Sequence, residues 1–382
     1  MDLTIQNRLP KEATAQVQRP RLEALTTLRF LAALHVVLFH LRVEGILSGG
    51  PWWYQNFAAI GYVGVDFFFV LSGFILVYTY NGTGTSPRRF WQARFARIYP
   101  AYIVSLLLTA PFFFFALRHL DLPFFEWSKQ HLALACILTL GLLQAWIPQA
   151  ALAWNPVCWS LSVEAFFYSI FPPLLKWTGT LSRHRLTASI AGFCAISFAF
   201  SLVYLFLHPD GLAVVNSGAT NLFWKNVLSF NPLVRLPEFA VGMLTAQLFM
   251  TSSKSYLPAG VFVTGGFLGF VALVLCAARI PSSLISPGLF SPAYAAIIYG
   301  LALRPKWAAV LEMKWLVLLG NASYSLYLLH SIVISWTFGA TLCLPHWLSV
   351  AAVLIAAVGA SLLSYLTIER PARRLFYPKK RG

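Results

Sequence analysis

The sequence predicts an all-α protein, a polytopic bundle of about ten helices that cross a membrane. Hydrophobic residues make up 58% of the 382 residues and charged residues 10%, whereas a soluble domain carries about 25% charged residues. The apolar segments are long and continuous rather than alternating, which favours helices over the strands of a closed barrel. Lys and Arg, 28 against 12 Asp and Glu, gather in the short segments between the apolar ones.

Each candidate span is an apolar run of the length that a helix needs to cross a bilayer, about 17 to 25 residues. Eleven such runs occur, at 25–42, 60–79, 98–117, 131–147, 157–175, 187–207, 233–250, 256–278, 284–303, 316–339 and 347–368. They form one membrane domain over 25–369, between a polar N-terminal tail at 1–24 and a basic C-terminal tail at 370–382. No apolar stretch with a small-residue cleavage site precedes Leu25, so we expect a retained signal anchor.

The distribution of basic residues predicts the orientation of the spans. Lys and Arg concentrate in segments 88–97, 176–185 and 304–314 and in the C-terminal tail, and all of these are expected on the cytoplasmic side. The N-terminal tail is expected there too. Eleven crossings would place the two termini on opposite sides. One of the runs 98–117 and 131–147 is therefore expected to be re-entrant or interfacial, which leaves about ten spans.

The sequence disfavours a nucleic-acid-binding protein and a protein built on disulfides or a metal site. The net charge of +16 could indicate a nucleic-acid partner, but basic residues that lie between apolar runs follow the positive-inside pattern, so no nucleic acid is expected. The five cysteines are irregularly spaced and predict neither a disulfide framework nor a metal site. We expect no metal.

Ionisable residues inside apolar spans are costly and are therefore candidates for function. The first span contains Arg29 and His40, eleven positions apart, which places both on one helix face and about 16 Å apart along the axis. Arg29 is expected near the cytoplasmic end and His40 in the outer half. The other ionisable residues expected in the outer half are Asp66, Glu164, Arg235, Glu238 and His330.

The separation of arginines near the cytoplasmic side from acids and histidines in the outer half suggests an anion site and a site of proton transfer. Arg94 and Arg97 are three residues apart at a predicted helix start, so both can face one anion. Arginine binds phosphate oxygens through paired donors. A histidine suits proton transfer near neutral pH. The pattern fits a phosphate-bearing donor that enters from the cytoplasm and reacts deeper in the membrane.

At these positions the sequence resembles the acyltransferase 3 family of membrane O-acyltransferases. The matching segments follow the family's order over most of 25–375: LRFLAALHVVLFH, GVDFFFVLSGF, RRFWQARFARIYPAY, WSLSVEAFFY, RLPEFAVGM, NASYSLYLLH and ERPARR. The resemblance implies transfer of an acyl group, usually acetyl from acetyl-CoA, across the bacterial inner membrane to a carbohydrate hydroxyl. Some members carry a fused extracytoplasmic esterase-like domain. This chain stops soon after Pro371, so we expect a stand-alone member.

The resemblance also implies roles for residues. It identifies Arg29, His40, Arg94 and Arg97 as the functional core, in which the three arginines bind the phosphates of acyl-CoA. His40 is expected to act as general base or as a transient acyl carrier, oriented by Asp66 or Glu164. The residues expected to contact substrate are Arg235, Glu238, His330 and Tyr324. Membrane lipid and a carbohydrate or glycolipid acceptor are the expected partners, with a polysaccharide biosynthesis complex as a further one.

Structural roles compete with several of these assignments. Asp66 could neutralise a buried cation, Glu164 could cap a helix start, and Arg235 could pair with Glu238 alone. At the level of the whole protein, a proton-coupled glycolipid or polysaccharide transporter would use the same intramembrane acids and histidines as a proton relay. A non-catalytic scaffold of a polysaccharide assembly complex would not need His40.

Overall fold

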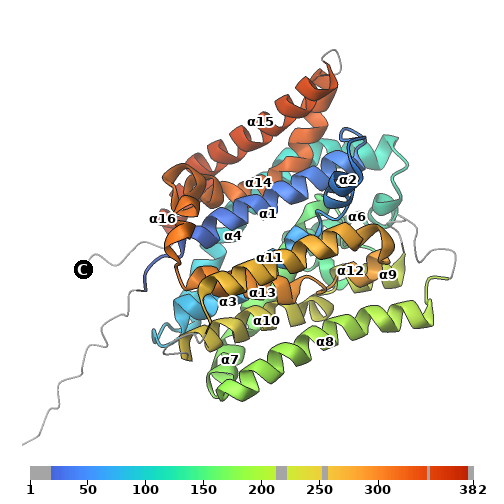
Figure 1. The fold of residues 1–382 in the computed structure, drawn as a ribbon. Coiled ribbons are helices and arrows are strands. Elements are labelled where there is room, and N and C mark those ends of the chain that lie inside the picture. Colours follow the sequence, from blue (N-terminus) through green and yellow to red (C-terminus); the bar gives the residue numbers. More distant parts are fainter. Residues whose placement is uncertain (1–18, 212–221, 252–256, 342–344, 377–382) are drawn as a thin grey trace, which may run out of the picture.

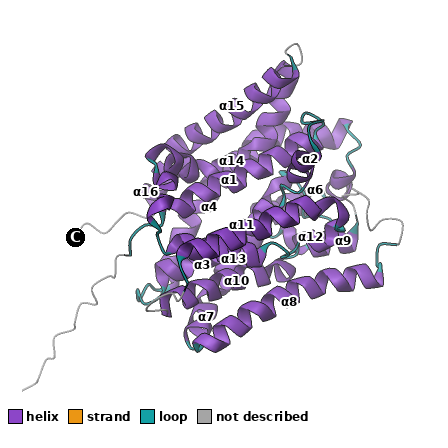
Figure 2. Cartoon of the chain, in the orientation of Figure 1, coloured by secondary structure: helices purple, strands orange, loops and turns teal. Residues whose placement is uncertain are grey.

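The computed structural model describes residues 19–211, 222–251, 257–341 and 345–376. All regular structure in these ranges is helical (Figure 2). Nine helices there are long and apolar enough to cross a membrane, which confirms the predicted fold class. They are built on α1 (Glu23–Val43), α3 (Val63–Tyr80), α4 (Pro87–His119), α7 (Trp159–Gly179), α8 (Arg183–Leu207), α10 (Pro232–Thr251), α11 (Ala259–Cys276), α14 (Lys314–Thr341) and α15 (His346–Ser364).

Shorter helices join these elements. The apolar α13 (Ser291–Ala302) lies where the run 284–303 was predicted to cross. The others are α2 (Trp52–Ala59), α5 (Glu126–Gln130), α6 (Leu132–Leu140), α9 (Phe223–Phe230), α12 (Ser282–Ile285) and α16 (Arg370–Phe376).

The structure distinguishes the two runs between which the sequence left a choice. The run 98–117 is part of α4, a helix of 33 residues that begins at Pro87 after the N-cap Ser86. The run 131–147 is a nine-residue helix, α6, followed by a turn. Nine residues extend about 14 Å, roughly half the thickness of the hydrocarbon core. The run 131–147 is therefore the one that does not cross as a helix.

Two close helix contacts position the candidate site. A Cβ added at Gly242 would lie 1.9 Å from the carbonyl oxygen of Val70, so α3 and α10 touch along their backbones. A Cβ added at Gly320 would lie 2.1 Å from the carbonyl oxygen of Thr26, so α1 and α14 meet in the same way. Small residues permit this approach, which membrane helix pairs commonly use.

The predicted cytoplasmic segments gather at one end of the bundle, here called the basic end. The start of α1 lies beside the end of α3, where the Tyr78 hydroxyl donates to the Pro20 carbonyl at 2.8 Å. Gln247, near the end of α10, accepts a hydrogen bond from Asn81 at 3.2 Å. It donates one at 3.3 Å to the hydroxyl of Thr178, near the end of α7. Figure 1 shows the start of α1 and α16 on the same side of the molecule. The basic segments thus share one end, as the positive-inside pattern requires.

The orientation of this end can be tested with single cysteines in a variant whose five native cysteines are replaced. Ser182, exposed between α7 and α8, lies at the basic end, and Ser48 is exposed after the opposite end of α1. We expect a membrane-impermeant maleimide to label Ser48→Cys in intact cells. Ser182→Cys should be labelled only after the cells are permeabilised. Labelling of Ser182→Cys in intact cells would contradict the orientation.

Candidate active site

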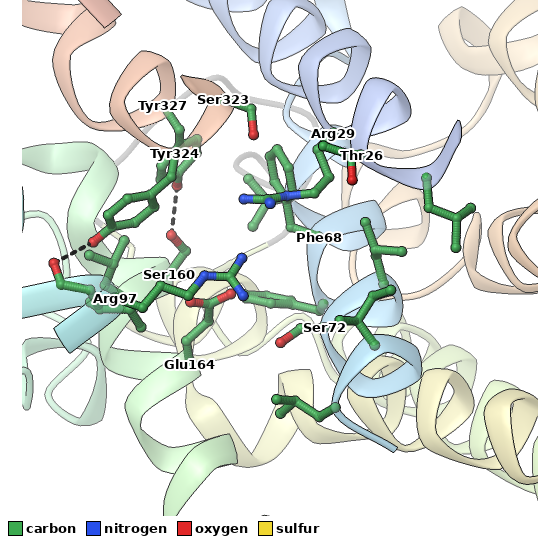
Figure 3. A pocket seen from close by; sticks show the side chains of 18 residues that line it. Thr26, Arg29, Phe68, Ser72, Arg97, Ser160, Glu164, Ser323, Tyr324 and Tyr327 are labelled. Carbon is green, nitrogen blue, oxygen red and sulfur yellow. Dashed lines mark hydrogen bonds between the residues drawn. The ribbon is translucent and has the colours of Figure 1, made fainter. Parts of the chain in front are cut away.

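A cavity of about 130 Å³ lies between α1, α3, α4, α7 and α14, toward the basic end. Its polar lining includes Arg29 from α1, Arg97 from α4 and Glu164 from α7. Figure 3 shows both guanidinium groups pointing into the cavity, with the Glu164 carboxylate beside the guanidinium group of Arg97. The remaining polar groups of the lining are hydroxyls, from Thr26, Ser72, Ser160, Ser323, Tyr324 and Tyr327.

The guanidinium groups of Arg29 and Arg97 lie near the Glu164 carboxylate but form no ion pair with it. Among the described residues neither makes a hydrogen bond or an ion pair within 4 Å. Glu164 interacts electrostatically with both, but its oxygen Oε2 accepts a hydrogen bond from the Tyr168 hydroxyl at 3.1 Å. Cations left unpaired in an apolar bundle are costly, which makes this cavity a candidate anion site.

Arg94 occupies a different position from Arg97. Its guanidinium donates to the Tyr80 hydroxyl at 3.1 Å and lies over the rings of Tyr80, Phe90 and Tyr168, at 5.5, 5.8 and 5.9 Å from their centroids. It is not part of the cavity lining. The two arginines thus flank Tyr168, and Arg97 alone of this pair faces the cavity.

Glu369 and Arg373, from the ERPARR segment, also belong to this region, and the sequence assignment of roles missed them. Glu369 is 1% exposed. It accepts from the Ser325 hydroxyl at 2.5 Å, from the Ser325 backbone N–H at 3.1 Å and from Arg373 at 2.8 Å. Both Glu369 and Arg373 interact electrostatically with Arg29. An acidic residue at the end of an apolar run was the signal that could have identified them.

The charges of this region do not balance. Four guanidinium groups, of Arg29, Arg94, Arg97 and Arg373, lie near two carboxylates, of Glu164 and Glu369. Among the described residues of this region, the guanidinium groups thus outnumber the carboxylates by two.

A second buried charge cluster pairs one guanidinium with two carboxylates. Arg235, 1% exposed, donates to Asp66 and lies 3.1 Å from Glu238. Both carboxylates are fully buried, and the Ser286 hydroxyl donates to Asp66 at 3.3 Å. Arg235 also lies over the rings of Phe69 and Trp159, at 5.3 and 5.6 Å.

This cluster corrects the expected arrangement around His40. The sequence led us to expect Asp66 or Glu164 against His40, but in the described part of the chain neither is hydrogen-bonded to it. The physical reason is the α3–α10 contact at Gly242, which brings Arg235 within reach of Asp66. Asp66 is thus the partner of a buried cation, and Arg235 and Glu238 form an ion pair.

The side chain next to His40 is that of His330. The sequence placed both at similar depth, and the structure brings His330 Nε2 to 3.2 Å from His40 Nδ1. Their ring centroids are 4.6 Å apart. Tyr327, one turn before His330 on α14, lines the cavity and is hydrogen-bonded to Ser160 at 2.7 Å (Figure 3). The histidine pair therefore lies one helical turn beyond the cavity wall.

Comparison with known proteins identifies the family of the chain. Residues 22–369 match the family model described as an acyltransferase domain. The chain belongs to the acyltransferase 3 family. It is a multi-pass membrane acyltransferase. No solved structure matches the chain.

Several bacterial proteins are similar to this acyltransferase. Acyltransferase MdmB of Streptomyces mycarofaciens is 28% identical over 378 residues, 93% of this chain and 92% of MdmB. O-acetyltransferase OatA of Staphylococcus aureus (strain NCTC 8325 / PS 47) is 25% identical over 94% of this chain, which spans only 60% of OatA. Exopolysaccharide production protein ExoZ of Rhizobium meliloti (strain 1021) is 28% identical over 82% of this chain and 90% of ExoZ.

Replacing Arg235, the cation shared by Asp66 and Glu238, tests the structural role of this cluster. Arg235→Met leaves two buried carboxylates without their partner, and breaking a buried ion pair in this way costs about 3–5 kcal/mol. We expect a large fall in the thermal unfolding midpoint of the purified protein in detergent. Arg118→Met, at an exposed position near the end of α4, is the control and should leave the midpoint unchanged. Equal midpoints for the two variants would contradict a structural role for Arg235.

Proposed function

We propose that this protein transfers an acyl group, with acetyl as the expected group, from cytoplasmic acyl-CoA to a carbohydrate hydroxyl at the other side of a bacterial inner membrane. The observation that carries the proposal is that Arg29 and Arg97 line a cavity toward the basic end, where their guanidinium groups form no hydrogen bond or ion pair with any described residue. Arg29 shares helix α1 with His40. One helix thus connects an anion site with a proton acceptor.

The donor site is supported by charge and by size. The two uncompensated positive charges suit the phosphate groups of coenzyme A, which guanidinium groups bind through paired hydrogen bonds. The volume of about 130 Å³ is smaller than the roughly 300–1,000 Å³ of pockets that enclose a drug-sized ligand. We therefore infer that the nucleotide stays at the basic end while the narrow pantetheine arm enters between the helices.

The distance along α1 is compatible with such an arm. Arg29 and His40 are separated by eleven residues, or about 16 Å of helix. The arm would pass Phe68, Tyr324 and Tyr327, which line the cavity, and bring its thioester toward the histidine pair.

His40 acts in this proposal as the general base. It takes the proton of the acceptor hydroxyl while the oxygen attacks the thioester carbonyl; the C–S bond breaks, and the thiolate of coenzyme A leaves with a proton returned by the imidazolium. A route through acyl-His40 is the alternative. Chemical trapping of an acyl-histidine during a single turnover would support that route.

The acceptor class is supported by two relatives. ExoZ is named for exopolysaccharide production and OatA for O-acetyl transfer, and both names fit a hydroxyl of a carbohydrate. We propose a carbohydrate or glycolipid acceptor that approaches from the end of α1 that carries His40.

Transfer of label from radioactive acetyl-CoA tests the proposal in membranes that contain the protein and the extracted glycans of the host. We expect the wild type to label a glycan. His40→Ala should lower the rate by 10²-fold or more, since a general base contributes about 10²–10⁴-fold. Arg97→Ala should lower the rate at limiting acetyl-CoA by roughly 10- to 100-fold, the value of a charge-assisted hydrogen bond.

Arg89→Gln is the matched control for this assay. Arg89 is exposed in the first turn of the helix that carries Arg97, and its replacement should leave the rate unchanged. Equal labelling by wild type, His40→Ala and Arg97→Ala, at equal amounts of inserted protein, would contradict the proposed function.

A further inference from the structure

The side chains of His40 and His330 are in contact, and backbone carbonyl groups beside them determine which ring nitrogen of each carries the proton. We propose that His330 is a positioning residue: together with the carbonyl oxygen of Val36 it accepts from Nδ1–H of His40, which fixes the orientation of the ring and leaves Nε2 of His40 as the basic atom. The inference rests on the proposed function, because it assumes that His40 is the general base.

The protonation of His40 follows from a backbone carbonyl. His40 Nδ1 lies 2.9 Å from the carbonyl oxygen of Val36, one turn earlier on α1. A carbonyl oxygen only accepts hydrogen bonds, so Nδ1 carries the proton. In the neutral ring, Nε2 then holds the free lone pair.

The protonation of His330 follows in the same way. Its Nδ1 lies 2.8 Å from the carbonyl oxygen of Tyr327 and 3.2 Å from that of Leu326, so Nδ1 donates here too. His330 Nε2 is then the acceptor that lies 3.2 Å from His40 Nδ1. Every short contact of the two rings is satisfied by this one pattern, in which the N–H of His40 is shared between Val36 and His330.

The packing around the pair supports a fixed geometry. His330 is fully buried, and the apolar residues Val37 and Leu41 of α1 pack in one cluster with Leu326 and Ile334 of α14. When His40 Nε2 takes a proton from the acceptor, its Nδ1–H becomes a stronger donor, and the His330 lone pair stabilises the imidazolium. A neutral acceptor costs less to bury than a carboxylate, and the carboxylate of Asp66 is committed to Arg235.

Two substitutions of His330 separate the contact with His40 from the contact with the backbone. The side-chain amide of Gln reaches the position of Nε2, and its oxygen can accept from His40. Asn places its amide at the position of Nδ1, where it can bond the backbone but cannot reach His40. In the acetyl-transfer assay we expect His330→Asn to lower kcat on the order of 10²-fold with KM for acetyl-CoA unchanged, and His330→Gln to restore most of kcat.

A matched control comes from a second buried histidine of α1. His35 Nε2 lies 2.7 Å from the carbonyl oxygen of Phe57 and its ring stacks on Phe57 at 4.0 Å, away from the pair. His35→Asn removes that contact and should leave kcat unchanged. Equal kcat values for His330→Asn and His330→Gln would overturn the inference. Full activity of His40→Ala would instead overturn the proposed function.

Solid-state ¹⁵N NMR of the wild type, with ¹⁵N-labelled histidine and in lipid, tests the tautomers in the unaltered protein; variants serve only to assign the resonances. The resonances of His40 and His330, identified from the spectra of His40→Ala and His330→Gln, should both show protonated Nδ1 and bare Nε2. His35 should show the opposite tautomer, because its Nε2 is the atom that faces a carbonyl. A protonated Nε2 on neutral His40 would overturn the inference.

Discussion

A charged side chain inside an apolar helix bundle needs a counterion, and this requirement separates the two charge clusters of the protein. Arg235 meets it within the chain, since the carboxylates of Asp66 and Glu238 both approach its Nη2 nitrogen. Arg29 and Arg97 meet it only in part, since the nearest carboxylates are shared with Arg94 and Arg373. A buried guanidinium that carboxylates of the bundle already neutralise serves the structure, whereas guanidinium groups that line a cavity and form no ion pair with the described residues are suited to an anionic ligand.

The helices that carry these charges also set the distance between the arginines of the cavity and the histidine pair. Helix α1 holds Arg29 near the basic end and His40 about three turns further on, and α14 follows it closely because Gly320 admits the backbone of Thr26. That contact lets Tyr324 and Tyr327 line the cavity while His330, on the same helix, reaches His40. Donor binding and proton transfer can therefore lie at different depths and still be held by one pair of helices.

Composition and pattern were enough to predict the fold class and the grouping of the basic segments, and Arg29, Arg97, Glu164 and Tyr324, singled out from the sequence, line the cavity. The pairing of Arg29 with His40 on one face follows from helix geometry alone. The partner of Asp66 could not be predicted, because it depends on how closely α3 approaches α10 at Gly242, a distance between segments far apart in the sequence. Arg94 and Arg97 share a helix face, but the rings of Tyr80, Phe90 and Tyr168, which hold Arg94 outside the cavity, come from three helices.

The central claim is that the unpartnered arginines bind the phosphates of the donor, and equilibrium binding of coenzyme A to the purified protein in lipid nanodiscs tests it most directly. Saturable binding is predicted for the wild type and for Arg118→Gln, whose substitution lies at the far end of α4. Arg97→Gln is predicted to bind roughly 10- to 100-fold more weakly, and its binding should depend less on salt. Equal affinity of the wild type and Arg97→Gln would contradict the account.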